Sequence, residues 1–272
     1  MEFGFGLGLA GGALMSGAAP APFHPSQLFA DGQAGHWPGG YDPASARIWQ
    51  AATGTVARVT AAGQPVGIVP DRSKGGVLGP ELSAPSYTIT AASGFQAIHT
   101  AVAAGLYRFD ITVVSGDGRC RQQGTAPAIL GGFTYAPAFV EADIPANVGS
   151  QLRINLSNAV NLVCHPTLRL IAGNHAWQEV ALSRPTLQQT GGKWHLVNDG
   201  GDSLPVKLPA GTYGRAWVSA AGVVTVDTVV DPVNALIPGE ANATQADVIL
   251  RAGAFSVAEE AHIRAWWGGR YT

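Results

Sequence analysis

The feature that most constrains the fold is a succession of short stretches in which apolar and polar residues alternate before a turn. The stretches are SYTIT (residues 86–90), GLYRFDITVVSG (105–116), QLRINLS (151–157) and LRLIAG (168–173). Alternation over about four to eight positions places apolar side chains on one face of a strand and polar ones on the other. Evenly spaced strands of this kind predict an all-β fold of the antiparallel β-sandwich or jelly-roll type.

Turn-forming residues and the C-terminal sequence complete this fold prediction. The chain has 36 glycines and 18 prolines, which separate the apolar pieces. Residues 193–230 predict roughly three or four more strands. One short helix is predicted near the C-terminus, because Ser256 and Glu259 have the spacing of a capping box before an apolar pattern. Gly268-Gly269 is expected to end that helix.

Composition limits the classes of partner. Sixteen Lys and Arg residues stand against 18 Asp and Glu, a net charge of −2, and no basic run occurs. The chain therefore lacks the electrostatic signature of a nucleic-acid-binding protein. The two cysteines, Cys120 and Cys164, are too few for a disulfide-dependent scaffold, and whether they pair stays open.

The first 22 residues, MEFGFGLGLAGGALMSGAAPAP, are apolar and carry no basic residue. A secretion signal needs a positive start, whereas Glu2 stands here. The run is also too short and too rich in glycine to predict a membrane span. We expect an apolar arm that buries its large side chains against a partner subunit, namely Phe3, Phe5, Leu7, Leu9 and Leu14.

No catalytic constellation stands out. The sequence has no GxSxG, HExxH or Walker A motif, and no two of its seven histidines have metal-ligand spacing. We therefore expect no enzyme activity, no catalytic residue, no metal and no cofactor. Two alternatives stay open at this point. One is a glycosidase-type carboxylate pair among Glu81, Asp110, Glu141, Asp143 and Glu179; the other is a Ca²⁺ site at Asn198, Asp199 and Asp202.

Aromatic residues are the other candidates for binding. Sandwiches bury alternate residues, so most aromatic rings should be core. Rings on the rim can stack on sugar rings, and the candidates for this role are Tyr107, Tyr135 and Trp177.

Two stretches resemble structural proteins of alphaproteobacterial phages, prophages and gene transfer agents. The first is LFADGQAGHWPGGYDPASARIWQAATGTVARVTAAGQPVGIVPDRSKG, and the second is SRPTLQQTGGKWHLVNDGGDSLPVKLPAGTYGRAWVSAAGVVTV. They are similar to family patterns of the form LFA-G…YDPS…GQPVG…DKSKG and RP-LQ…GKW…LPAGTY. Together they cover about a third of the chain. The family includes tail fibres and head spikes, and the resemblance does not separate head from tail.

One departure from the family pattern predicts the domain organisation. In many relatives the DKS segment runs directly into a GNHA segment, but here about a hundred residues separate Asp71–Gly75 from Gly173–Ala176. We infer an inserted β-sandwich at 80–172. Residues 23–79 and 173–272 then form one discontinuous β module, preceded by the arm at 1–22.

The resemblance implies a structural component of a tailed-phage-like particle, a head spike or fibre that helps attachment to the host surface or capsule polysaccharide. The expected partners are other virion proteins, further copies of the chain and a host polysaccharide, with no nucleic acid and no membrane. The expected location is the virion, assembled in the bacterial cytoplasm. The alternatives are a tail-associated polysaccharide-degrading enzyme and a secreted carbohydrate-binding β-sandwich protein.

Overall fold

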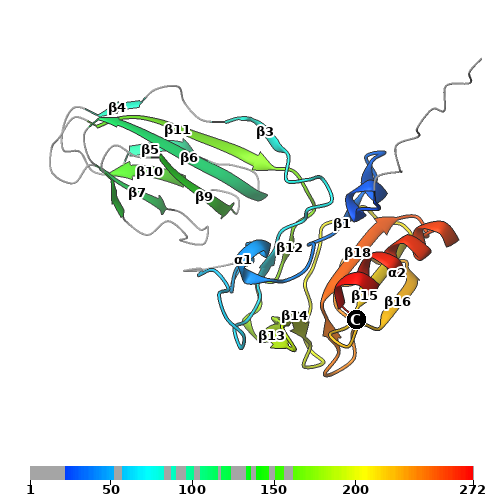
Figure 1. Cartoon of the computed structure of the whole chain (residues 1–272). Helices are drawn as coiled ribbons and strands as arrows, with labels where there is room; N and C mark the ends of the chain where they lie inside the picture. Colours follow the sequence, from blue (N-terminus) through cyan, green and yellow to red (C-terminus); the bar gives the residue numbers. More distant parts are fainter. Residues whose placement is uncertain are drawn as a thin grey trace, which may run out of the picture.

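The computed structural model is mostly β-sheet, which confirms the all-β prediction (Figure 1). It describes residues 22–51, 57–82, 87–89, 96–100, 105–115, 118–123, 133–135, 139–146, 151–155 and 162–271. Strands account for 34% of the chain, far more than helices do. All pairings between the named strands are antiparallel.

The central segment folds as a jelly roll. Its strands are β3 (Leu78–Glu81), β4 (Tyr87–Ile89), β5 (Gln96–Thr100), β6 (Gly105–Ser115), β7 (Gly118–Gln123), β8 (Phe133–Tyr135), β9 (Phe139–Ala146), β10 (Gln151–Asn155) and β11 (Leu162–Ile171). The pairs β4–β11, β5–β10, β6–β9 and β7–β8 are nested in the sequence like the two arms of one long hairpin. Rolling that hairpin gives two facing sheets, β3/β4-β11-β6-β9 and β5-β10-β7-β8.

The two ends of this jelly roll lie side by side and form a neck. β3 pairs with the end of β11, so that Glu81 lies opposite Arg169 and Leu78 opposite Ile171. The pairing of these two segments continues to the lower end of the neck, where the Ala172 amide donates to the Val77 carbonyl at 2.8 Å. Adjacent ends are what an inserted segment requires. Whether residues 80–172 fold alone stays a prediction.

The remaining described residues form a base around a four-stranded sheet. Its order is β1 (Gly35–His36), β18 (Asp247–Ala252), β15 (Tyr213–Val218) and β16 (Val224–Val229). Two smaller sheets are β13 (Thr186–Thr190)-β14 (Lys193–Val197)-β17 (Thr244–Gln245) and β2 (Ile68–Val69)-β12 (Ala176–Trp177). Short helical turns are η1 (Pro25–Phe29), α1 (Pro43–Ala46) and η2 (Ala181–Ser183). The β1–β18 and β2–β12 pairs join sequence from before the jelly roll to sequence from after it.

Helix α2 (Val257–Tyr271) covers one face of the four-stranded sheet (Figure 1). Successive β18 residues belong to different cores: Ile249 packs in a cluster with Ile263 and Trp267 of α2, whereas Val248 and Leu250 pack in the cluster on the other face. β18 is therefore buried on both faces, which explains its continuous apolar run.

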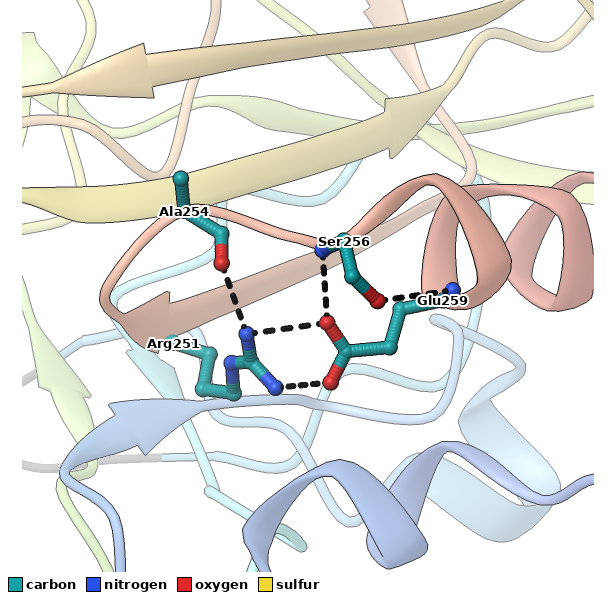
Figure 2. Close-up of polar contacts among 4 residues, drawn as sticks. All are labelled: Arg251, Ala254, Ser256 and Glu259. Carbon is teal, nitrogen blue, oxygen red and sulfur yellow. Dashed lines mark hydrogen bonds and ion pairs between the residues drawn. The ribbon is translucent and has the colours of Figure 1, made fainter.

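The start of α2 is held by the capping box that the sequence predicts. The Ser256 amide donates to Glu259 Oε2 at 2.7 Å, and the Glu259 amide donates to Ser256 Oγ at 3.3 Å. Figure 2 shows that the same carboxylate also binds the Arg251 guanidinium through both of its oxygens. A further Arg251 bond reaches the Ala254 carbonyl at 2.9 Å. This partly buried, bidentate pair joins the helix to β18.

The prediction that Gly268-Gly269 ends the helix is wrong, because α2 continues to Tyr271. Glycine costs only about 1 kcal/mol in a helix relative to alanine, and tertiary contacts outweigh that cost here. Trp267 is fully buried, and the Tyr271 hydroxyl donates to the Ala246 carbonyl at 3.3 Å. The Lys193 amine donates to the Tyr271 carbonyl at the helix end.

Candidate functional site

Asp71 is the centre of a buried polar network at the foot of the neck. Its Oδ1 accepts from the Trp37 amide at 3.0 Å and the Ser73 amide at 2.8 Å. Its Oδ2 accepts from the Asn174 amide at 2.7 Å and the Ser73 hydroxyl at 2.8 Å. The carboxylate is 1% exposed, so these four donors replace its water. Asp71 thereby joins the two halves of the base at the point where the jelly roll leaves it.

Two histidines extend this network. His175 Nδ1 accepts from the Asp71 amide at 3.0 Å, so its Nε2, 3.0 Å from the Ile171 carbonyl, carries the proton. His36 Nδ1 lies 2.7 Å from the Asn174 carbonyl and must therefore be protonated. Complete burial lowers the pKa of His36. The negative charge of Asp71 and the hydrogen bond to the Asn174 carbonyl act to raise that pKa, but burial outweighs them. Both rings hold strand ends in place.

Gly173 shows why the chain needs glycine between these groups. Its φ is +146°, and a Cβ there would lie 2.9 Å from Asp71 Oδ2. Any side chain would push the carboxylate off the Asn174 amide. The Asp71–Lys74 and Gly173–His175 segments, which the family resemblance singles out, are thus in direct contact although about a hundred residues separate them.

A groove of about 690 Å³ opens beside the network. Its walls are Ser26, Phe29 and Ala30 from η1, Ser73–Gly75 from the turn after Asp71, and Val77 and Ala172–Asn174 from the neck. Val77, one of its lining residues, is 61% exposed. We refer to this feature as the neck groove.

The arm side chains Phe3, Phe5, Leu7, Leu9 and Leu14 lie outside the described residues, which begin at Pro22. The chain that follows the arm is anchored on the base. The Phe23 ring stacks on His262 of α2 with centroids 5.2 Å apart, and His24 meets Trp37 and Trp266 edge-on. The first described residues therefore pack on the base just before η1, which also forms one wall of the neck groove.

The three predicted sugar-stacking residues have different outcomes. Tyr107 is only 3% exposed, so the prediction for this residue is wrong; its ring packs in the interior at the start of β6. The side chain of Tyr135 lies outside the described residues. Trp177 is half-buried against the cluster of Trp49, Ile68, Leu106 and Ile171 that joins the jelly roll to the base. A sugar-binding role for Trp177 stays a prediction.

The candidate carboxylates do not form one described cluster. Glu81 pairs with Arg169 at 3.5 Å across the neck, and both side chains are about 40% exposed. Asp110 lies in the middle of β6, where Thr167 donates to it at 3.4 Å. The β6–β9 register places Asp110 opposite Glu141 and Arg108 opposite Asp143, but the side chains of Glu141 and Asp143 lie outside the described residues. Glu179 is exposed between β12 and η2.

The residues of the alternative Ca²⁺ site, Asn198, Asp199 and Asp202, form a turn. Side-chain oxygens of this turn accept hydrogen bonds from its own backbone amides. Asn198 Oδ1 accepts from the Gly200 amide at 2.8 Å and the Asp202 amide at 3.2 Å. Asp202 Oδ2 accepts from the Asp199 amide at 2.9 Å. Within the part of the chain that the structure describes, no group of three or more His, Cys, Asp or Glu residues is arranged to hold a metal ion. The side chains of Cys120 and Cys164 are outside that part.

Sequence reasoning missed the buried hydrogen-bonding roles of Asp71, His36 and His175. Charged and imidazole side chains are ordinarily exposed, so periodicity gives no sign of them. The available signal was the family pattern, which contains both the DKS and the GNHA segments.

Comparisons with known proteins return no match to a family model, to a curated protein or to a solved structure. Among the described residues, no helix has the length and apolar character needed to cross a membrane.

Proposed function

We propose that this chain is a structural component of a tailed-phage-like particle, a head spike or fibre that helps attachment to the host cell surface or its polysaccharide. The observation that carries the proposal is a jelly roll mounted by a two-stranded neck on a separate base (Figure 1). Jelly rolls occur widely in capsid and lectin domains. Since a fold alone does not define a function, the assignment to a particle also depends on the family resemblance in the base.

The division of roles follows from where these features lie. Both stretches that resemble the phage proteins belong to the base, and the apolar arm directly precedes the base in the sequence. The base is therefore the part suited to joining other particle proteins, including further copies of this chain. The jelly roll is the part free to project, because its link to the base is the neck and the small cluster around Trp49 and Ile171.

A deletion experiment tests this function. Particles from cells that lack the gene should still assemble but adsorb poorly to encapsulated hosts, and expression of the full chain should restore adsorption. A chain that carries only the base should enter particles without restoring adsorption. Absence of the chain from purified particles, or normal adsorption by the deletion strain, would contradict the proposal.

A further inference from the structure

Strand β16 (Val224–Val229) is an open edge of the four-stranded sheet of the base. The order β1-β18-β15-β16 places it last, and among the described residues no strand pairs with its outer side (Figure 1). An edge strand presents a row of unpaired amides and carbonyls, which makes it a ready template for a further strand. The chemistry and register of β16 therefore decide what it can bind.

The features that usually protect an edge strand are missing from β16. Lysine, proline and β-bulges are the common devices. Residues 223–230, VVTVDTVV, contain neither lysine nor proline, and their register with β15 has no shift. The one charged side chain, Asp227, is paired with Arg215 of β15. Val223 and Val230 at the two ends are 62% and 78% exposed. Such a regular, valine-rich edge suits the addition of another strand.

The β15–β16 hairpin shows which backbone groups of β16 face outward. The Ser219 amide donates to the Val223 carbonyl at 3.0 Å, so these two residues form a hydrogen-bonded pair. Hydrogen-bonded pairs alternate with non-hydrogen-bonded pairs along an antiparallel ladder, so the odd-numbered residues of β16 bond to β15. The even-numbered residues turn their amides and carbonyls to the open side; these are Val224, Val226 and Thr228.

Two of these three outward positions are available. At the first, Arg264 of α2 donates to the Val224 carbonyl at 2.9 Å, in agreement with a carbonyl that points away from β15. A carbonyl oxygen has two lone pairs, so it can accept a second bond. Thr228 is exposed, and within the described part of the chain the outward groups of Val226 and Thr228 have no hydrogen-bond partner.

The outward positions of β16 match those of a second β16 strand. With a twofold axis at Val226, two antiparallel β16 strands place Val226 opposite Val226 and Val224 opposite Thr228 as hydrogen-bonded pairs. Val224 and Val226 pack on the α2 face of their own sheet. The same register therefore continues the valine row of that face from one copy into the other.

The opposite face fits the same register. There Thr225 faces Asp227 of the second copy, and the exposed Val223 faces Val229. Sliding one strand by two residues would place the two Asp227 carboxylates opposite each other, which is unfavourable. The reverse slide pairs the end of β16 with the hairpin turn. The register centred on Val226 thus keeps like charges apart and aligns the whole strand.

We propose that two copies of this chain associate through β16, paired antiparallel about a twofold axis at Val226, so that their sheets become continuous. This contact goes beyond the function proposed above, because it specifies how two copies meet and depends only on this chain. Pairing over one short strand buries little surface, so the dissociation constant should be on the order of 10–100 µM. Copies held side by side on a particle have a high effective concentration, at which such a contact forms.

The test measures association and edge protection on the purified full chain. Sedimentation equilibrium, over concentrations that extend well below and above the expected dissociation constant, gives the dimer affinity. Amide hydrogen exchange followed by NMR gives the site. The Val226 and Thr228 amides should be protected at high concentration and exchange quickly on dilution. The Thr225 and Asp227 amides, which bond to β15, should stay protected throughout.

Substitutions at Thr228 test the backbone pairing. Thr228→Pro removes an outward amide and leaves the bonds to β15 intact, so it should weaken the dimer at least about tenfold. Thr228→Val keeps the amide and suits a strand, so the dimer affinity should stay within about twofold of the wild type. Circular dichroism of both variants should match the wild type.

Substitutions at Thr225 test the register by charge. Thr225→Glu places a carboxylate opposite Asp227 of the second copy, twice in each dimer, and should weaken association about fivefold. Thr225→Lys places a cation there and should tighten association about threefold. The matched controls are Thr190→Glu and Thr190→Lys, at an exposed threonine of β13, and they should leave the affinity unchanged. Opposite effects from one position cannot come from a general loss of folding.

Three results would overturn the proposal. A chain that stays monomeric, with fast exchange at Val226 and Thr228, leaves the edge for the strand of a different protein. Protection of these amides at every concentration, lost on deletion of residues 2–20, shows that the arm occupies the edge. A dimer that withstands Thr228→Pro and the Thr225 charges uses another surface. None of these results bears on whether the chain is found in particles, so the proposed function is tested separately.

Discussion

Asp247→Asn is the substitution that most sharply tests the energetics of the base. Asp247 is 2% exposed, and four N–H groups donate to it. Oδ1 accepts from the Gly40 and Val248 amides at 3.0 and 2.9 Å, and Oδ2 accepts from the Trp37 and Trp267 indoles at 3.2 and 3.0 Å. An asparagine supplies only one oxygen. Whichever way its amide turns, an NH₂ group faces two donors.

The magnitude follows from those contacts. Two hydrogen bonds to a charged acceptor are lost at about 1.5 kcal/mol each, so the free energy of unfolding should fall by about 3 kcal/mol. That loss corresponds to a Tm lower by roughly 10 °C for a chain of this size. The matched control is Asp227→Asn, which breaks the Arg215 pair on a carboxylate that is 36% exposed. That exposed pair is worth about 0–1 kcal/mol.

Urea unfolding followed by tryptophan fluorescence is the assay, because Trp37 and Trp267 report on the site directly. Burial raises the pKa of Asp247, although the Trp267, Trp37, Val248 and Gly40 hydrogen bonds oppose that rise. The contribution of the Asp247 titration to the free energy of unfolding is therefore largest at low pH. It is lost as pH rises from 3.8 through the raised pKa. Asp247→Asn should remove that dependence. A loss no larger than that of Asp227→Asn would refute the reasoning.

Three further predictions follow from the structure. Burial lowers the pKa of His36 below 6.5, so its contribution is present above that pH and is lost as pH falls through the folded value; His36→Gln should flatten the free energy of unfolding measured between about pH 7.5 and 5. Glu259→Gln should cost about 2 kcal/mol by calorimetry, because it leaves the Arg251 guanidinium without its carboxylate, whereas the adjacent Glu260→Gln should be near neutral. Deleting residues 2–20 should leave the circular dichroism of the β modules unchanged but lower the copy number in purified particles; normal incorporation would show that the arm is not the anchor.

The stabilisation from Glu259 depends on pH in the opposite direction to that from Asp247. Burial acts to raise the pKa of Glu259, but the hydrogen bonds from Arg251 and Ser256 outweigh it and lower the pKa. Its contribution is therefore present above 4.5 and is lost as pH falls through the folded value.

Periodicity predicted the all-β class and several strands of the jelly roll, because alternation is a local signal. The stretches at 105–116, 151–157 and 168–173 contain β6, β10 and the end of β11. The nested pairing of β4 to β11 could not be deduced from alternation, which reports which face is apolar and not which strand lies alongside. The capping box was predictable because its hydrogen bonds span only three residues.

The sequence-based predictions fail where a residue is buried by segments that are distant from it in the sequence. Tyr107 was predicted to reach the rim, but Leu106 and Tyr107 are both buried. Leu106 packs against Trp49 and Ile68 of the base, so the start of β6 is covered on both faces and alternation fails there. Asp71 and Asp247 gave no signal in the apolar periodicity for the same reason. Their N–H partners come from segments brought together only by the completed base.

The central claim is that the base joins this chain to the particle while the jelly roll projects from it. Cryo-electron microscopy of intact particles, compared with particles from cells expressing a chain without residues 80–172, tests it most directly. The claim predicts outward density on the wild-type particle that fits the jelly roll, with the base docked beneath it, and loss of only the outward density in the truncated form. A jelly roll buried within the particle wall, or no difference between the two particles, would contradict it.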